Sequence, residues 1–291
     1  MFHGSLVALV TPMADDGQVD FAALEALVRW HMSEGTDAIV AVGTTGESAT
    51  LETAEQMKVV DCCLRAANGQ IPVIAGVGSN STARAVALAR LAQARGAAAG
   101  LAVVPYYNKP TQEGMYRHFR AIAEAVSLPI ILYNVPSRTA ADLLPETIGR
   151  LAAVPNIIGV KEATGKLERL EEIRRLCGPD FLLLSGDDAT AMEFMLRGGR
   201  GVISVTANVV PKLMHALCVV ACSGERKKAE ILNQRLDTLH QHLFLESNPI
   251  PVKWALAQMG RIHTGIRLPL TPLAFAHQPA LRETLRSVGA L

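Results

Sequence analysis

The chain lacks an excess of charge of either sign, and it lacks a long apolar run. Its 28 Lys and Arg residues balance 27 Asp and Glu residues, for a formal net charge of +1, and no polybasic stretch is present. Nucleic acid and anionic membrane surfaces are therefore not expected partners. No stretch reaches the roughly 18 apolar residues of a membrane span, and the start of the chain carries no charged leader region. We expect a cytoplasmic protein that acts on small molecules.

Cysteines are few, and their spacing is not that of a metal site. The five are Cys62, Cys63, Cys177, Cys218 and Cys222. Each stands among apolar neighbours in a helix-like stretch, which predicts reduced core residues. Cys218 and Cys222 are one helical turn apart, but a helix that faces a core gives that spacing routinely. His240 and His242 are two residues apart on a predicted helix, so they point to different faces and predict no zinc pair.

Eight apolar, β-branched runs are present, each followed by a segment of helical periodicity. They cover residues 6–10, 38–42, 72–77, 99–104, 129–133, 157–161, 181–184 and 201–205. Continuous rather than alternating apolar runs are typical of parallel strands that are covered on both faces. Eight such units predict an α/β fold of the closed (β/α)8 type, the TIM barrel, whose usual size is about 250 residues.

The alternative is an open, doubly wound sheet. That fold would place a glycine-rich dinucleotide turn after its first strand, where this chain has Val10-Thr11-Pro12-Met13. No glycine-rich phosphate loop follows the last two predicted strands either, so a phosphorylated substrate is not expected. After Ser223-Gly224, three helical stretches follow without strands, near residues 225–245, 251–261 and 279–288. We predict a catalytic barrel over 1–223 and a C-terminal helical extension over 224–291.

Active sites of such barrels lie at the carboxyl ends of the strands, and Lys161 ends the sixth run. Burial disfavours the ammonium form and can lower the pKa of a lysine by up to roughly 3 to 5 units, which yields an amine that attacks carbonyls. The alternative is a first solvated residue after a buried strand, the commoner case for a lysine chosen at random. Tyr133 ends the fifth run and would add an acid/base. Arg138 follows on the loop and would add an anion clamp, although a solvated loop arginine would stand in the same place.

Two further strand ends carry polar side chains. Thr44 and Thr45 stand between glycines in a turn that suits a small anion such as a carboxylate, although a plain turn with a helix cap has the same sequence. A threonine hydroxyl bonded to the Tyr133 phenol would pass protons. Asp187 and Asp188 open a predicted helix, and we interpret them as a cap rather than as metal ligands.

Three motifs resemble the dihydrodipicolinate synthase and N-acetylneuraminate lyase family of class I aldolases. They are Gly43-Thr44-Thr45-Gly46-Glu47, Tyr133-Asn134-Val135-Pro136-Ser137-Arg138-Thr139 and Gly159-Val160-Lys161-Glu162. The resemblance runs from end to end and includes Pro249-Ile250-Pro251-Val252-Lys253 and Arg267-Leu268-Pro269-Leu270. It implies a lyase in which Lys161 forms a Schiff base with pyruvate. The enamine would then attack L-aspartate 4-semialdehyde, an early step of diaminopimelate and lysine synthesis.

The resemblance also implies roles for individual residues. Thr44, Tyr133 and Tyr107 would relay protons, with Tyr107 reaching in from a neighbouring subunit of a homotetramer built as a dimer of dimers. Thr45 would hold the carboxylate of pyruvate and Arg138 that of the semialdehyde. The backbone of Gly186 and Ile203 would line the pocket. No metal or organic cofactor is implied, because the lysine itself is the electron sink.

Two alternatives to this activity stay open at the level of sequence. Sialic acid lyases of the family share the tyrosine and the lysine but lack the arginine that stands here at Arg138, so a retro-aldol lyase acting on a sugar acid is the nearer alternative. A catalytically inactive barrel that serves as a scaffold is the other. Every reactive side chain that the family pattern requires is present, which disfavours the scaffold.

The resemblance also implies a position for a regulatory lysine site at a dimer interface. Ser48, Ala49, Asn80 and Tyr106 match it. Where feedback-sensitive members carry histidines, this chain has Thr53 and Gln56, and where they carry a glutamate that faces the effector's ammonium, it has Arg84. A cation in place of a carboxylate reverses the sign of that interaction, so we expect weak inhibition by lysine or none.

Overall fold

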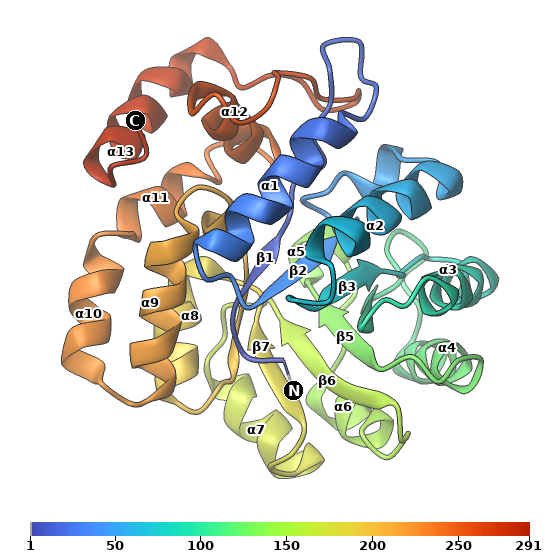
Figure 1. The fold of residues 1–291 in the computed structure, drawn as a ribbon. Coiled ribbons are helices and arrows are strands. Elements are labelled where there is room, and N and C mark those ends of the chain that lie inside the picture. Colours follow the sequence, from blue (N-terminus) through green and yellow to red (C-terminus); the bar gives the residue numbers. More distant parts are fainter. Residues whose placement is uncertain (1) are drawn as a thin grey trace.

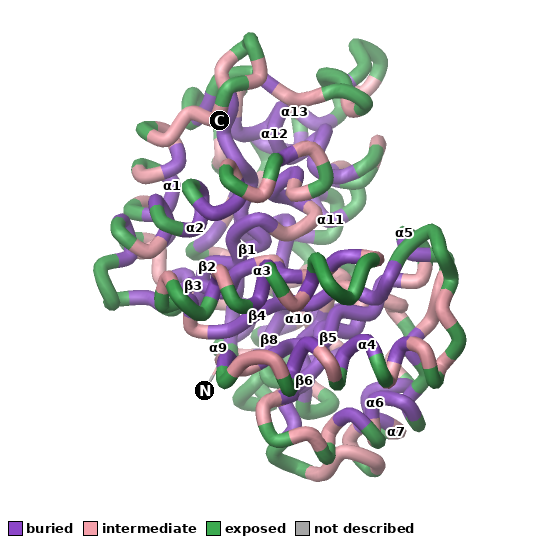
Figure 2. The backbone as a smooth tube through the Cα atoms, turned by 90° about the vertical axis from the view of Figure 1, so that its right-hand side faces the viewer, coloured by how far each residue is buried: buried purple, intermediate pink, exposed green. Residues whose placement is uncertain are grey.

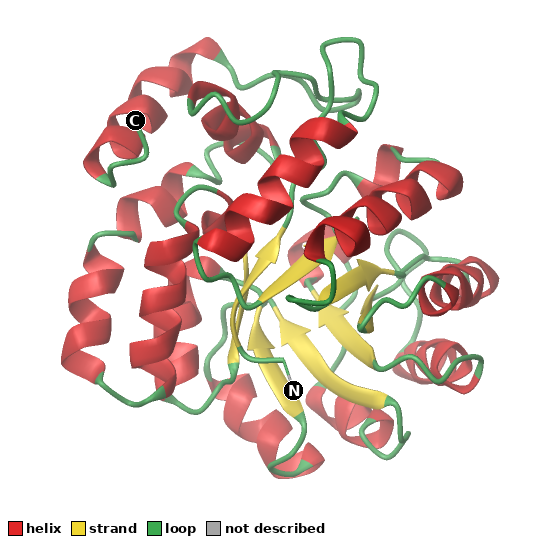
Figure 3. Ribbon diagram, in the orientation of Figure 1, coloured by secondary structure: helices red, strands yellow, loops and turns green. Residues whose placement is uncertain are grey.

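Eight parallel strands form a closed barrel in the computed structural model, which describes residues 2–291 (Figures 1 and 3). The strands pair in chain order, and β1 closes the barrel against β8. They are β1 (Gly4–Ala8), β2 (Ala38–Ala41), β3 (Val73–Gly76), β4 (Ala99–Val103), β5 (Ile130–Asn134), β6 (Ile157–Glu162), β7 (Leu182–Ser185) and β8 (Gly201–Ser204). All eight predicted runs form strands, so the predicted TIM barrel is confirmed.

Helices surround the barrel, as Figure 3 shows. They are α1 (Phe21–Ser33), α2 (Thr53–Ala67), α3 (Thr82–Ala94), α4 (Gln112–Glu124), α6 (Pro145–Leu151), α7 (Glu168–Cys177), α8 (Asp188–Leu196) and α9 (Pro211–Cys222). Side-chain caps begin several of them, since Asp20, Ser81 and Thr111 each accept a hydrogen bond from a backbone N–H of the first turn. Three shorter elements lie in strand-to-helix loops: η1 (Ser48–Thr50), α5 (Pro136–Thr139) and η2 (Thr206–Asn208).

The last part of the chain is helical and packs beside α8 and α9 (Figure 1). It contains α10 (Arg226–Gln234), α11 (Asp237–His242), α12 (Ile250–Gln258), η3 (Phe275–His277) and α13 (Gln278–Ser287). The single helical stretch expected over 225–245 is therefore wrong. The chain breaks near Leu236, where the Asn233 side chain donates to Asp237 Oδ1 at 2.6 Å, a local contact that competes with helix continuation.

The core has two layers, because successive strand residues point to opposite faces of the sheet. Leu6 and Ala8 of β1 pack inside the barrel with Ile131 and Leu184, whereas Val7 packs outward against the helices. Figure 2 shows the buried backbone concentrated along the strands. This double burial explains why the strands are continuous apolar runs.

The cysteines only partly match the expectation of core residues. All five are free thiols, and Cys62, Cys63 and Cys218 are buried, while Cys177 is half-buried. Cys222 is exposed, so the expectation was wrong for it: it is the last residue of α9, where the helix leaves the core. Burial raises the pKa of the Cys218 thiol well above its usual value.

Two buried histidines should make the folded protein less stable in mild acid. Burial lowers the pKa of His31 to about 3 and that of His118 to about 4, and Nδ1 of each ring lies 2.9 Å from a threonine hydroxyl. The unfolded chain, with ordinary values near 6.5, binds more protons below that pH, so stability falls as the pH falls from 6.5 towards 4. A change from pH 7 to pH 5 therefore lowers the free energy of unfolding by about 2 kcal/mol for each histidine.

We expect the free energy of unfolding, measured by denaturant titration at fixed protein concentration, to drop accordingly from pH 7 to pH 5. The variant His118→Gln should show about half of that drop, because one of the two histidines no longer titrates. An unchanged pH dependence in this variant would contradict the assignment.

Candidate functional site

A cavity of about 550 Å³ opens at the carboxyl ends of the strands. Its lining combines strand ends and the loops after them with residues of the C-terminal extension. The polar residues in the lining are Thr44, Thr45, Tyr133, Ser137, Arg138, Lys161, Asp187, Ser247 and Asn248. The structure therefore brings together most of the side chains that the sequence predicts for the site.

Lys161 and Tyr133 form the centre of this cavity. The register of β5 and β6 places them directly opposite each other, and Lys161 Nζ lies 4.3 Å from the centroid of the Tyr133 ring. Lys161 is only 6% exposed, yet it lines the cavity, so its amine is held in an apolar barrel and faces the space for a ligand. Within residues 2–291 the Tyr133 phenol makes no hydrogen bond to a threonine, which differs from the expectation.

Gly186 permits the close packing around this lysine. A Cβ atom at this position would lie 2.6 Å from the Ala163 side chain and 2.9 Å from Lys161 Cε, so a larger residue would displace the lysine. Ile203, by contrast, packs in the inner core and is not part of the lining, where Val205 stands instead. Ile203 precedes Ser204, the last residue of β8, so its side chain lies deeper in the barrel than the cavity lining.

The Thr44-Thr45 turn is held from several sides. Thr45 is buried and its hydroxyl accepts a hydrogen bond from Asn248 Nδ2 at 2.9 Å. Two residues on, Glu47 adopts a left-handed conformation (φ 55°) and forms a buried ion pair with Lys253 of α12. Burial lowers the pKa of Lys253, while the Glu47 carboxylate opposes that shift. The extension thus supports the turn that is expected to bind pyruvate.

Asp187 is a helix cap, as predicted, although it also lies at the edge of the cavity. Its carboxylate accepts from Thr190 N at 3.2 Å and from Thr190 Oγ1 at 2.6 Å at the start of α8. Asp188 is buried and accepts from the backbone of Val205 and Thr206, which ties α8 to the end of β8. The fold therefore uses Oδ2 of each carboxylate, while Asp188 Oδ1 is buried without a hydrogen-bond partner.

Arg138 lies on the exposed rim, and its Nη2 donates to the backbone carbonyl of Asn248 at 3.3 Å. Tyr107 does not enter the cavity of its own chain. It is 88% exposed, adopts a φ of 74° that is uncommon outside glycine, and borders a shallow hollow that Arg138 also lines. An aromatic side chain held outward in this way is available to a neighbouring subunit.

Sequence reasoning missed Phe244, Ser247 and Asn248 as part of the site. They lie in the segment between α11 and α12, more than 80 residues after Lys161 along the chain. The available signal was the motif that begins at Pro249, directly after Asn248, but nothing in it indicates a contact with Thr45.

A second cavity of about 400 Å³ adjoins the first and shares Thr44, Tyr133 and Arg138 with it. Of the residues expected in a regulatory site, the structure places there Ser48, Ala49, Gln56, Arg84 and Tyr106. Thr53 and Asn80 are not in its lining, and the Asn80 carbonyl accepts from Asn108 instead. The Gln56 amide is used by the fold, because it donates to the carbonyls of Ser48 and Leu51.

Over residues 2–291, no helix combines the length and the apolar character needed to cross a membrane. In the same part of the chain, no group of three or more His, Cys, Asp or Glu residues is arranged to hold a metal ion. His240 and His242 contact threonine hydroxyls, at 2.8 Å and 2.7 Å.

Known proteins are similar to this chain in sequence and in fold. The 4-hydroxy-tetrahydrodipicolinate synthase of Methylococcus capsulatus is 60% identical over 291 residues and that of Pseudomonas aeruginosa 59% identical over 292 residues, with full coverage of both chains in each case. The crystal structure of the chloride-inhibited dihydrodipicolinate synthase from Acinetobacter baumannii complexed with pyruvate has a TM-score of 0.99, 53% identity and full coverage of both chains. A profile of the Dihydrodipicolinate synthetase family matches residues 1–288. The chain therefore belongs to the dihydrodipicolinate synthetase family.

Proposed function

We propose that this protein is a 4-hydroxy-tetrahydrodipicolinate synthase, a lyase of the class I aldolase type that condenses pyruvate with L-aspartate 4-semialdehyde in diaminopimelate and lysine synthesis. The observation that carries the proposal is the buried Lys161 amine facing the cavity beside Tyr133. The names of relatives at 60% and 59% identity over the full length, and the pyruvate complex of the Acinetobacter enzyme, support the same activity.

The chemistry begins at Lys161. Its amine adds to C2 of pyruvate, the carbinolamine loses its hydroxyl as water, and loss of a C3 proton gives an enamine. The enamine carbon attacks the aldehyde of the second substrate, and the aldehyde oxygen takes up a proton to become a hydroxyl. The amino group of the new adduct then attacks C2, closes the ring and releases Lys161. Tyr133, Thr44 and a partner's Tyr107 are the proposed carriers of these protons.

The carboxylates of the two substrates need separate binding residues. We assign that of pyruvate to Thr45, and that of the semialdehyde to Arg138 on the rim. The backbone of Gly186 and Ile203 is proposed to line the substrate pocket; Gly186 is in the cavity lining, and the Ile203 side chain packs in the inner core. No metal or organic cofactor enters this scheme.

Arg138 also separates this proposal from a sugar-acid lyase. Loss of a charged hydrogen bond costs about 1.5 to 3 kcal/mol, roughly one to two decades in transition-state binding. We expect Arg138→Ala to lower kcat/KM for aspartate semialdehyde by that factor, while the KM for pyruvate changes little. Steady-state kinetics with each substrate varied in turn measure both. Semialdehyde kinetics equal to those of the unmodified protein would remove this role.

The direct test of the activity is consumption of pyruvate with candidate aldehydes. Pyruvate should disappear with aspartate semialdehyde and not with N-acetylmannosamine, the aldehyde that a sialic acid lyase would condense. Borohydride and pyruvate alone should leave a covalent adduct, which a catalytically inactive scaffold would not form.

The assembly and the location belong to the same proposal. We propose a homotetramer built as a dimer of dimers, in the cytoplasm, with residues 1–223 as the catalytic barrel and 224–291 as the extension. The outward Tyr107, together with the partly exposed Tyr106 beside it, supports an interface between subunits at this rim.

For regulation, we expect lysine to inhibit weakly or not at all. Arg84 lines the cavity of the expected regulatory site, and no carboxylate of residues 2–291 lies within ion-pair distance of it. Its charge repels the ammonium of an effector, and a like charge in a confined site is strongly unfavourable. A lysine titration at saturating pyruvate measures this, and Arg84→Glu should increase the sensitivity. Strong inhibition of the unmodified protein at sub-millimolar lysine would contradict the prediction.

A further inference from the structure

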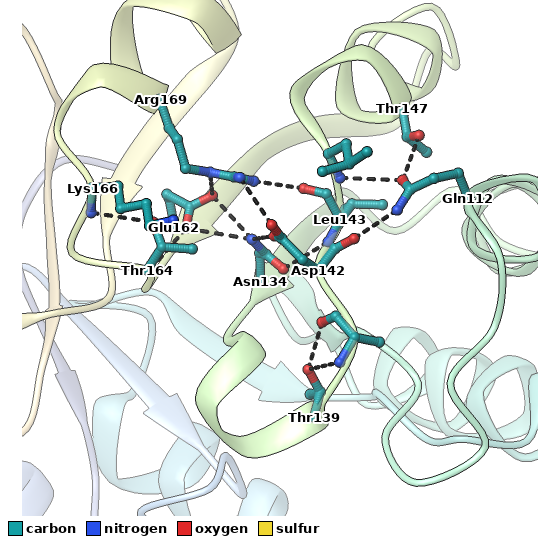
Figure 4. Close-up of polar contacts among 12 residues, drawn as sticks. Gln112, Asn134, Thr139, Asp142, Leu143, Thr147, Glu162, Thr164, Lys166 and Arg169 are labelled. Atoms are coloured by element: carbon teal, nitrogen blue, oxygen red, sulfur yellow. Dashed lines mark hydrogen bonds and ion pairs between the residues drawn. The ribbon is translucent and has the colours of Figure 1, made fainter.

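A buried polar network lies behind the ends of β5 and β6, on the side away from the cavity (Figure 4). The register pairs Tyr133 with Lys161 and, one residue later, Asn134 with Glu162. Because strand side chains alternate, the first pair faces the cavity and the second faces the helices. The Glu162 carboxylate accepts hydrogen bonds from Thr164 N at 2.8 Å and from Asn134 Nδ2 at 3.2 Å. None of these outward groups takes part in the proposed chemistry.

Arg169, near the start of α7, joins this carboxylate to a different part of the chain. Its Nε lies 3.2 Å from Glu162 Oε2, its Nη1 lies 3.1 Å from Asp142 Oδ2, and its Nη2 donates to the Leu143 carbonyl at 2.7 Å. The side chain is 9% exposed. The planar guanidinium reaches three acceptors in fixed directions, which the single ammonium of a lysine cannot do.

These contacts hold together the two ends of the loop that carries Arg138. We call these ends, Asn134 on one side and Asp142 with Leu143 on the other, the neck of the loop. Asn134 begins the loop, and its side chain accepts from Leu143 N at 3.0 Å and donates to Asp142 Oδ1 at 2.8 Å. Between these ends, Ala140 has a φ of 55°, a conformation that a residue with a Cβ keeps only when its surroundings hold it. Apart from its own bond to the Asn248 carbonyl, Arg138 is thus placed by a strained loop that is fastened at its neck.

We propose that Arg169 is a positioning residue for Arg138. By fastening Asp142 and Leu143 to Glu162, it fixes the loop relative to the strand that carries Lys161, and so sets the distance between the nucleophile and the carboxylate of the second substrate. The inference rests on the proposed function, in which Arg138 binds the semialdehyde. Lys161 and Tyr133 are held by the strand ladder itself and do not depend on the neck.

The test is Arg169→Lys, which keeps the buried positive charge and loses the fork. We expect the KM for aspartate semialdehyde to rise about tenfold, because small misplacements of binding groups have effects of this size or larger. The KM for pyruvate and the rate of borohydride trapping with pyruvate alone should stay within about twofold. Arg95→Lys is the matched control: Arg95 also spans a carboxylate, Asp61 at 3.1 Å, and a carbonyl, Leu91 at 3.1 Å, and contacts no site residue.

A double-mutant cycle separates positioning from general destabilisation. In an Arg138→Ala background, Arg169→Lys should change the semialdehyde KM by less than about twofold, because the group that it positions is already absent. Full additivity, an unchanged semialdehyde KM in Arg169→Lys, or an equal loss in trapping with pyruvate alone would each overturn the inference. If Arg169→Lys does not fold, Asp142→Asn loosens the same neck from the other side and is held to the same outcomes.

Failure of the proposed function can be distinguished from failure of the inference about Arg169. If the unmodified protein gives no trapped adduct with pyruvate, the activity is wrong. If Arg138→Ala alone leaves semialdehyde kinetics unchanged, the role of Arg138 is wrong, and the inference about Arg169 falls with it.

Discussion

Replacing Lys161 with arginine should abolish turnover while the protein stays folded. Arginine keeps a positive charge and a long side chain, but its guanidinium is always protonated and cannot form an imine. We expect kcat to fall by roughly 10³-fold or more, the scale of losing a nucleophile. The structure sharpens this expectation, because the Lys161 amine lies over the Tyr133 ring, its aliphatic stem packs against Gly186, and the described lining of the cavity contains no second lysine.

Borohydride reduction in the presence of pyruvate checks the assignment directly. Intact-mass measurement should show one added pyruvate-derived group per chain in the unmodified protein and none in Lys161→Arg. Lys253→Arg is a useful comparison, since Lys253 is also buried but is paired with Glu47 and lies outside the cavity lining, so trapping should persist. A trapped adduct in the Lys161→Arg protein would show that another amine reacts.

Tyr107→Phe should be nearly as damaging, although Tyr107 lies outside the cavity of its own chain. If its hydroxyl completes the proton relay of a neighbouring subunit, its loss removes a general acid/base, for which the usual effect is about 10²- to 10⁴-fold. Mixing inactive Tyr107→Phe chains with inactive Lys161→Arg chains should then restore activity. A mixed dimer contains one site with both the lysine of one chain and the tyrosine of the other.

Subunit exchange has to be verified for this mixture, for example by native mass spectrometry of differently labelled chains. A mixture of Lys161→Arg with Tyr133→Phe chains is the control, because Tyr133 and Lys161 lie on adjacent strands of one chain, so no mixed dimer can form an intact site even though Tyr107 is present in both chains. In that second mixture every site lacks either Lys161 or Tyr133. Verified exchange without recovery in the first mixture would exclude the shared relay.

The barrel could be predicted from sequence because double burial makes each strand a continuous apolar run. Lys161 and Tyr133 could be predicted as neighbours for a related reason: strand ends of a parallel barrel meet at one rim, and register then pairs them. The contribution of Asn248 could not be predicted this way. Its contact with Thr45 spans 203 residues and depends on how the extension packs, which leaves no local pattern.

Another error had a local cause. Cys222 has apolar neighbours in sequence, yet a helix end exposes it. The role inferred for Arg169 could not be predicted from sequence either. In a helix rich in charged residues, the sequence does not distinguish a buried arginine from an exposed one.

The ion pair of Glu47 with Lys253 has a consequence for how the protein is made. Glu47 leaves the ribosome early in synthesis, and its partner stands 206 residues later. We therefore expect the Thr44-Thr45 turn of a nascent barrel to stay unfastened until translation has passed α12. Ribosome-stalled chains that end before residue 248 should form no borohydride-stable adduct with pyruvate, whereas released full-length chains should form one. If this is so, the order of synthesis keeps the Lys161 amine from reacting with cellular carbonyls until the C-terminal extension has been made.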